Sequence, residues 1–150
     1  MPSVDFSRKV TVPATPETAW TIVTDVDRVA GWVTVIGSVV EVEHLSRYSA
    51  VLADRLGPFK LSADLTVSVT HLDELRSIAF LADGEDRQVA SRIKIEAELT
   101  ISPTTEGCEI DVAGRYEVTG RVANLGSSMI RAKGERILDE FFAKVETEVV

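Results

Sequence analysis

The sequence predicts an α+β fold in which a curved antiparallel sheet of six to seven strands wraps around one long C-terminal helix. Two observations predict it. Apolar and polar residues alternate in a series of short segments between residues 4 and 118, and the apolar spacing becomes helical after Gly120. Such alternation is typical of an antiparallel sheet with one face in water, and helices on one side of that sheet make an α+β fold. We expect residues 1–150 to form a single domain.

The first elements are a strand and two short helices. Residues 4–12 alternate as a half-buried strand does, although Arg8 interrupts the apolar face. Thr15 is suited to cap a helix, and Pro16 is suited to its first position. One face of this helix is apolar and consists of Ala19, Trp20, Val23 and Val26. A second short helix is expected over residues 27–32.

The middle of the chain reads as successive strands, because hairpins are the simplest connection between neighbouring strands. The expected strands cover residues 38–44, 47–56, 59–70, 75–82, 93–101 and 108–118. The clearest is 59–70, where every odd position is apolar and every even position is polar. Residues 83–86 read as a polar turn.

The last segment predicts one long helix. Its apolar residues follow helical spacing: Val122, Leu125, Met129, Ile130, Ile137, Leu138, Phe141, Phe142, Val145 and Val149. A helix of about thirty residues would be about 45 Å long. Gly126 and Gly134 lie among small residues, which either leave room for a cavity or allow close packing of the helix on the sheet.

Composition excludes several classes of function. A net charge of −8 argues against nucleic-acid binding, which needs a basic surface. No segment is long and apolar enough to span a membrane, and the N-terminus lacks the pattern of a secretory signal. We therefore expect a cytoplasmic protein. The single cysteine, Cys108, excludes an internal disulfide and is expected to be a buried thiol.

No catalytic or metal-binding motif is present, and we expect no cofactor. His44 and His71 lie on different expected strands, so they form no local ligand pair. Polar groups that could face a cavity are Arg8, His44 and Asp54, judged by their strand parity. Each has a simpler interpretation as a rim or strand-end residue. Arg8 and Asp54 could otherwise serve an enzyme as polar groups or anchor the polar head of a ligand.

A sheet curved around a thin helix tends to enclose an apolar cavity, which favours a ligand-binding protein over an enzyme. The candidates for its lining are Trp32, Ile36, Leu52, Leu65, Ile95, Leu99, Tyr116, Leu125, Met129 and Ile130. Trp32 has two interpretations, as a cover for the ligand or as a packing residue. Arg121, Arg131, Lys133 and Arg136 either face anionic lipid or an acidic partner, or belong to the wet side of the helix.

The whole chain resembles a known family. The first motif is Val12-Pro13-Ala14-Thr15-Pro16-Glu17-Thr18-Ala19-Trp20, and the second is Leu56-Gly57-Pro58-Phe59. The most specific is Gly120-Arg121-Val122-Ala123-Asn124-Leu125-Gly126, followed by Leu138-Asp139-Glu140-Phe141-Phe142. In these motifs the sequence resembles the helix-grip superfamily of START-type lipid-binding and polyketide-cyclase-like (SRPBCC) domains. Within it, the sequence is most similar to the carbon monoxide dehydrogenase G-subunit family.

The resemblance implies an accessory protein of a molybdenum-containing hydroxylase, associated with the inner face of the membrane and carrying a lipid or a quinone-like molecule. The expected partners are therefore a hydrophobic ligand, a molybdenum hydroxylase complex and, peripherally, a membrane. The alternative is a polyketide cyclase or dehydratase-like enzyme that uses the same cavity.

Overall fold

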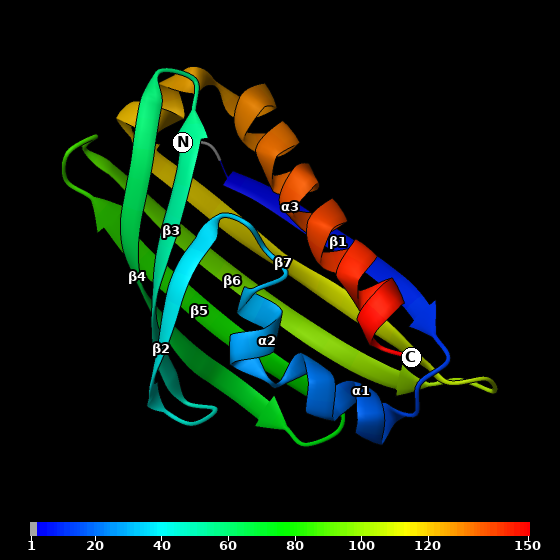
Figure 1. Cartoon of the computed structure of the whole chain (residues 1–150). Coiled ribbons are helices and arrows are strands. Elements are labelled where there is room, and N and C mark those ends of the chain that lie inside the picture. Colours follow the sequence, from blue (N-terminus) through cyan, green and yellow to red (C-terminus); the bar gives the residue numbers. More distant parts are fainter. Residues whose placement is uncertain (1–2) are drawn as a thin grey trace.

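The computed structural model describes residues 3–150 and contains one seven-stranded sheet with helices on one side (Figure 1). The strands are β1 (Ser3–Val12), β2 (Ile36–Glu43), β3 (Arg47–Leu56), β4 (Phe59–Asp73), β5 (Ser77–Asp86), β6 (Ser91–Pro103) and β7 (Cys108–Gly120). The helices are α1 (Pro16–Val23), α2 (Val26–Ala30), a 3₁₀-helix η1 (Arg121–Leu125) and α3 (Ser127–Glu148). This architecture confirms the predicted α+β helix-grip fold.

The spatial order of the strands is β1-β7-β6-β5-β4-β3-β2, and every pair is antiparallel. Strands β2 to β7 are therefore joined as successive hairpins, and the first strand pairs with the last. The sheet curves, so that β3, one strand from its edge, is bridged to α3: Lys133 Nζ on the helix lies 2.8 Å from Asp54 Oδ2 on the strand. This curvature encloses the space between the sheet and the helix.

The two short helices follow β1 as predicted. Thr15 caps α1, because its Oγ1 accepts a hydrogen bond from the Thr18 N–H, and Pro16 occupies the first turn. Helix α2 is capped by Asp25, whose side chain accepts from the Arg28 N–H. In Figure 1 both helices lie at the end of the sheet where α3 finishes.

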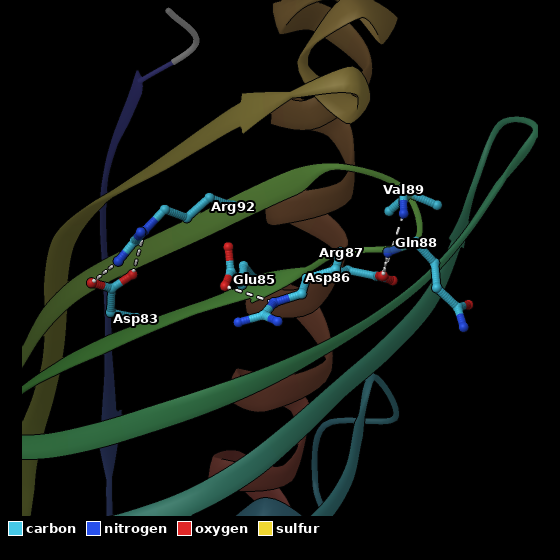
Figure 2. A network of polar contacts seen from close by, with 7 residues as sticks. All are labelled: Asp83, Glu85, Asp86, Arg87, Gln88, Val89 and Arg92. Atoms are coloured by element: carbon cyan, nitrogen blue, oxygen red, sulfur yellow. Dashed lines mark hydrogen bonds and ion pairs between the residues drawn. The ribbon is translucent and has the colours of Figure 1, made fainter.

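The predicted polar turn at residues 83–86 is wrong, because these residues continue β5. Asp83 pairs across the sheet with Lys94 in register and bonds Arg92 through both carboxylate oxygens. The chain turns instead at residues 87–90 (Figure 2), where the Asp86 carboxylate accepts the backbone N–H groups of Gln88 and Val89. Polar residues on the wet face of a strand resembled a turn.

The predicted single helix of about thirty residues is also wrong, since it is two helices divided at Gly126. Gly126 has φ of 92°, a conformation that favours glycine. The 3₁₀-helix η1 precedes it and α3 follows it with 22 residues. The chain therefore changes direction at Gly126 before α3 crosses the sheet.

Two apolar clusters lie between the sheet and the helices. The first joins α1, the C-terminal part of α3 and the adjoining ends of β1, β6 and β7, and its buried aromatic residues are Trp20 and Trp32. The second joins β3 to β7 with Val122 of η1 and Ile130 of α3, and its buried members are aliphatic. A cavity under the N-terminal half of α3 adjoins this second cluster.

Candidate functional site

A cavity of about 170 Å³ lies between the sheet and the N-terminal half of α3. Its lining is apolar except for a few side chains, and it comes from five strands, the loop before β2, η1 and α3. The lining residues are Phe6, Val35, Leu52, Asp54, Leu56, Leu61, Ser91, Ile93, Ile95, Tyr116, Val118, Val122, Ile130, Lys133, Gly134, Ile137 and Leu138. Its volume is close to that of an engineered apolar cavity that holds a benzene molecule.

The strands supply the cavity wall from alternate positions, because side chains two residues apart share one face of a strand. Leu52, Asp54 and Leu56 of β3 follow this rule, as do Ile93 and Ile95 of β6. Apart from Asp54, these side chains are aliphatic and offer no hydrogen bonds to water. The wall is therefore suited to an apolar occupant.

Tyr116 spans the interior from β7 to α3. Its Oη donates to the Ile130 carbonyl oxygen at 3.2 Å, and its ring centroid lies 6.1 Å from that of Phe6. Burial raises the pKa of Tyr116, Glu135 adds to the rise and Arg131 opposes it. The hydroxyl thus stays protonated and remains a donor. Gly134 admits this ring, because a Cβ at Gly134 would collide with its hydroxyl end.

Asp54 and Lys133 are the charged side chains in the lining, and they form an ion pair with a separation of 2.8 Å. The side chain of Asp54 is 18% exposed and that of Lys133 is 25% exposed. Partial exposure places the pair where the apolar interior meets solvent. Asp54 Oδ1 also accepts the N–H of Arg55 at 2.8 Å.

One end of the cavity rests on a polar corner at the β5–β6 turn. Asp86 Oδ2 accepts the Ser62 N–H at 2.7 Å, and its Oδ1 accepts from the turn shown in Figure 2. Ser91 Oγ donates to the Val89 carbonyl oxygen and accepts the Val122 N–H at 2.9 Å. The hydrogen bonds that Asp86 accepts from Ser62, Gln88 and Val89 lower its pKa, the one from Ser62 most, against the effect of its burial. The corner ties β4, β5, β6 and η1 together.

The loop between α2 and β2 is fastened to α3. Glu140 accepts the Thr34 N–H at 2.7 Å and the Thr34 Oγ1–H at 3.0 Å. Beside it, the Trp32 ring centroid lies 5.8 Å from that of Phe141. Val35 of this loop lines the cavity. The loop therefore closes one side of the cavity and packs against the helix.

Of the residues chosen from the sequence, Leu52, Asp54, Ile95, Tyr116 and Ile130 line the cavity. Their role as ligand contacts stays a prediction. The other candidates lie elsewhere: Arg8, Trp32, Ile36, His44, Leu65, Leu99, Leu125 and Met129. Trp32 and Leu99 belong to the cluster at the far end of α3, so Trp32 is a packing residue here. Leu65 and Leu125 pack in the nearer cluster, and Ile36 is half-buried at the start of β2.

Besides Ile36, three candidates lie outside both clusters: Arg8 is engaged in ion pairs, and His44 and Met129 are exposed. Arg8 does face α3, but its guanidinium bonds Glu135 at 2.7 Å and Asp139 at 2.6 Å. The His44 side chain is 71% exposed, with Glu41 as its neighbour. Met129 is 43% exposed, because it lies on the outer side of the first turn of α3.

Sequence reasoning missed Lys133 as a lining residue and placed it in a basic surface cluster. The signal was present: Lys133 is three residues after Ile130 and four before Ile137, so it shares their face of the helix. Leu61, Ile93 and Val118 were on the correct strand parity and were not chosen.

Two further observations bear on the chemistry of residues 3–150. Within this range, no group of three His, Cys, Asp or Glu side chains is placed to hold a metal ion. No helix in the same range has both the length and the apolar character needed to cross a membrane.

Known proteins share the fold of this chain. We found no significant match among curated protein sequences. A conserved protein from Geobacillus kaustophilus has a similar structure, with a TM-score of 0.82, 20% identity, and coverage of 98% of this chain and 94% of that chain. A START superfamily protein from Mycobacterium smegmatis matches with a TM-score of 0.68, 17% identity, and coverage of 98% and 96%.

The di-domain ARO/CYC StfQ from the steffimycin biosynthetic pathway also matches, with a TM-score of 0.71 and 12% identity, over 98% of this chain and 50% of that chain. At such identities, these likenesses show the fold alone. The family comparison goes further, because the profile of the carbon monoxide dehydrogenase G-subunit (CoxG) family matches residues 9–150. The chain therefore belongs to the carbon monoxide dehydrogenase G-subunit (CoxG) family.

Proposed function

We propose that the protein binds a hydrophobic small molecule, of lipid or quinone-like type, in the cavity under α3 and carries it without changing it chemically. The observation that carries this proposal is the apolar cavity of about 170 Å³, bounded by aliphatic side chains and by one ion pair at its margin. Membership of the family and the likeness to a START superfamily protein support a hydrophobic ligand.

The size of the cavity limits how much of the ligand it holds. Because a cavity of about 150 Å³ accommodates benzene, this one has room for one ring or a short acyl segment. A longer molecule would place its remainder toward the Asp54–Lys133 margin, where both side chains are partly exposed.

Family membership supports the next part of the proposal, that the carrier serves a CO dehydrogenase-type molybdenum hydroxylase. The test is co-purification of the tagged protein with the hydroxylase from cells that express both. Absence of the enzyme from the eluate, with the carrier folded and its ligand bound, would remove this part and leave the carrier function.

The surface formed by segments 54–60 and 120–133, next to the cavity, supports peripheral contact with an anionic membrane at the inner face of the cell membrane. Segments 54–60 and 120–133 are adjacent there, since Gly57 lies against Leu125 and Arg121 lies over the Phe59 ring at 5.5 Å. Together they contain one acid, Asp54, and the cations Arg55, Lys60, Arg121, Arg131 and Lys133, in a chain of net charge −8. Sedimentation with vesicles containing phosphatidylserine, compared with neutral vesicles, tests the contact.

A test of ligand binding is native mass spectrometry of the protein purified from its own host, with organic extraction of whatever is bound. Leu52→Trp should displace the ligand, because Leu52 lines the cavity. Leu72→Trp is the matched control, since Leu72 is 46% exposed on β4. Protein that is empty in every preparation, or equal occupancy in both variants, would refute the proposal.

A cyclase or dehydratase-like enzyme is the second candidate. It requires Arg8 and Asp54 to converge on a ligand, whereas Arg8 is bonded to Glu135 and Asp139 and lies outside the cavity lining. Asp54 has both carboxylate oxygens engaged. The geometry supports the carrier better.

A further inference from the structure

The Asp54–Lys133 ion pair supplies the charged groups of the cavity lining. We infer that the Lys133 ammonium donates a hydrogen bond to an acceptor oxygen on the ligand, and that Asp54 is the positioning residue that holds Lys133 in place. This inference rests on the proposed carrier function and deepens it. It assigns to the ligand a carbonyl, quinone or ester oxygen on an otherwise apolar body.

In this ion pair the carboxylate is fully engaged, whereas the ammonium is not. Asp54 Oδ1 accepts from the Arg55 N–H at 2.8 Å, and Oδ2 lies 2.8 Å from Lys133 Nζ. An ammonium has three donors and no acceptor. In the part of the chain that the structure describes, Asp54 is the one ion-pair partner of Lys133. Lys133 thus has donors to offer a ligand, whereas the carboxylate is already engaged twice.

The other polar side chains of the lining already have hydrogen-bond partners within the protein. Ser91 Oγ is bonded to the Val89 carbonyl oxygen and to the Val122 N–H. Tyr116 Oη donates to the Ile130 carbonyl oxygen. Both groups hold the fold together, and the remaining lining side chains are apolar. A ligand oxygen inside this cavity therefore finds its donor at Lys133.

The free donors of Lys133 favour one class of ligand. A polar oxygen placed in an apolar cavity without a donor is costly, and a bond to a charged donor is stronger than one between neutral groups. A ligand with an acceptor oxygen gains this bond. A cationic ligand gains nothing from Asp54, because Lys133 already neutralises that carboxylate. The site thus selects for acceptor oxygens and against ammonium groups.

The test uses two probes of equal shape, acetophenone and α-methylstyrene, which differ in carrying C=O or C=CH₂ on the same phenyl ring. Each is titrated into isotope-labelled protein, and its dissociation constant is obtained from NMR chemical shifts. The quantity compared is the ratio of the two constants, because it cancels the shared hydrophobic contribution.

In Lys133→Met, which keeps the side-chain length, the preference for acetophenone over α-methylstyrene should fall about tenfold, as the loss of a charge-assisted hydrogen bond implies. Lys144→Met is the matched control, since Lys144 is exposed on the same helix and lies outside the cavity lining. It should leave the ratio unchanged.

A second variant keeps the test decisive if Lys133→Met folds poorly with an unpaired carboxylate. Asp54→Leu with Lys133→Met removes both charges, an exchange that buried ion pairs tolerate. It should bind α-methylstyrene at least as well as the natural protein and lose the preference for acetophenone. An unchanged ratio in this variant overturns the inference while leaving the carrier function in place. If neither probe binds the natural protein, the carrier function fails and the inference with it.

Discussion

The two halves of the space under α3 differ although one helix covers both. The packed half surrounds the C-terminal part of α3, where the Phe141 ring packs against the rings of Trp32 and Phe142 and Val145 is fully buried. The hollow half surrounds the N-terminal part, where Ile130, Lys133 and Gly134 line the cavity; Asp54 lies opposite Lys133, Tyr116 lies against Gly134, and most other strand residues of the lining are aliphatic. The cavity therefore comes from side-chain size along the helix, because the same sheet and helix continue through both halves.

Removing an aromatic ring from the packed half should cost the most stability. Phe142 is 5% exposed, so Phe142→Ala should lower the free energy of unfolding by about 3–5 kcal/mol, by lost burial and a new void. Leu52→Ala in the hollow half should cost less, about 2 kcal/mol or below, since a residue beside a void makes fewer contacts. Urea denaturation measures both. Equal losses would contradict a division into packed and hollow halves.

The polar corner that closes the hollow half is the next place to test. Asp86→Asn replaces one of two acceptor oxygens with a donor facing a backbone N–H, either that of Ser62 or that of Gln88. We expect a loss of about 1–3 kcal/mol near neutral pH, the usual cost of a buried group left without its partner. Asp83→Asn on the same strand is the control and should cost less, because its partner Arg92 lies on the exposed face.

The hydrogen bonds to Asp86 should also make the stability of the protein fall at acidic pH. The pKa of Asp86 is lowered by the hydrogen bonds it accepts, first that from Ser62. A lowered folded-state pKa contributes stability that is present above the unfolded pKa of about 4 and is lost as the pH falls through the folded value. Urea denaturation over that acidic range should show the natural protein losing more stability than Asp86→Asn. Parallel curves for the two proteins would contradict this assignment.

The sheet and the helix could be predicted because each is written in local periodicity. Strict alternation in residues 59–70 and helical spacing after Gly120 depend on nothing distant. The turn was misplaced because Asp83 faces solvent on a strand, where its partner Arg92 belongs to the next strand. Sequence alone does not show that pairing.

The site was less predictable, because parity gives the face of a strand but not the depth of a residue along it. Leu52 and Leu99 both face the helix, yet Leu52 lines the cavity and Leu99 packs in the opposite half. Lys133 shows the same limit on the helix. Its spacing places it beside Ile130, but its meaning depends on Asp54 of β3 lying opposite.

The smallest effect concerns Gly134, where α3 lies against the Tyr116 ring of β7. Alanine normally stabilises a helix interior by about 1 kcal/mol relative to glycine. At Gly134 the new methyl group would meet the hydroxyl end of Tyr116, which is itself bonded to the Ile130 carbonyl oxygen. Crowding of this kind costs about 1–3 kcal/mol, so Gly134→Ala should be destabilising by about 1 kcal/mol.

Combining Gly134→Ala with Tyr116→Leu tests whether crowding against the ring causes the destabilisation. In a Tyr116→Leu background the ring is gone, so Gly134→Ala should become stabilising by up to about 1 kcal/mol, the ordinary helix preference. A thermal or urea double-mutant cycle gives the coupling between the two positions. If Gly134→Ala has the same sign with and without the ring, then Gly134 is not there to admit Tyr116. The hollow half would then owe its shape to the aliphatic strand residues alone.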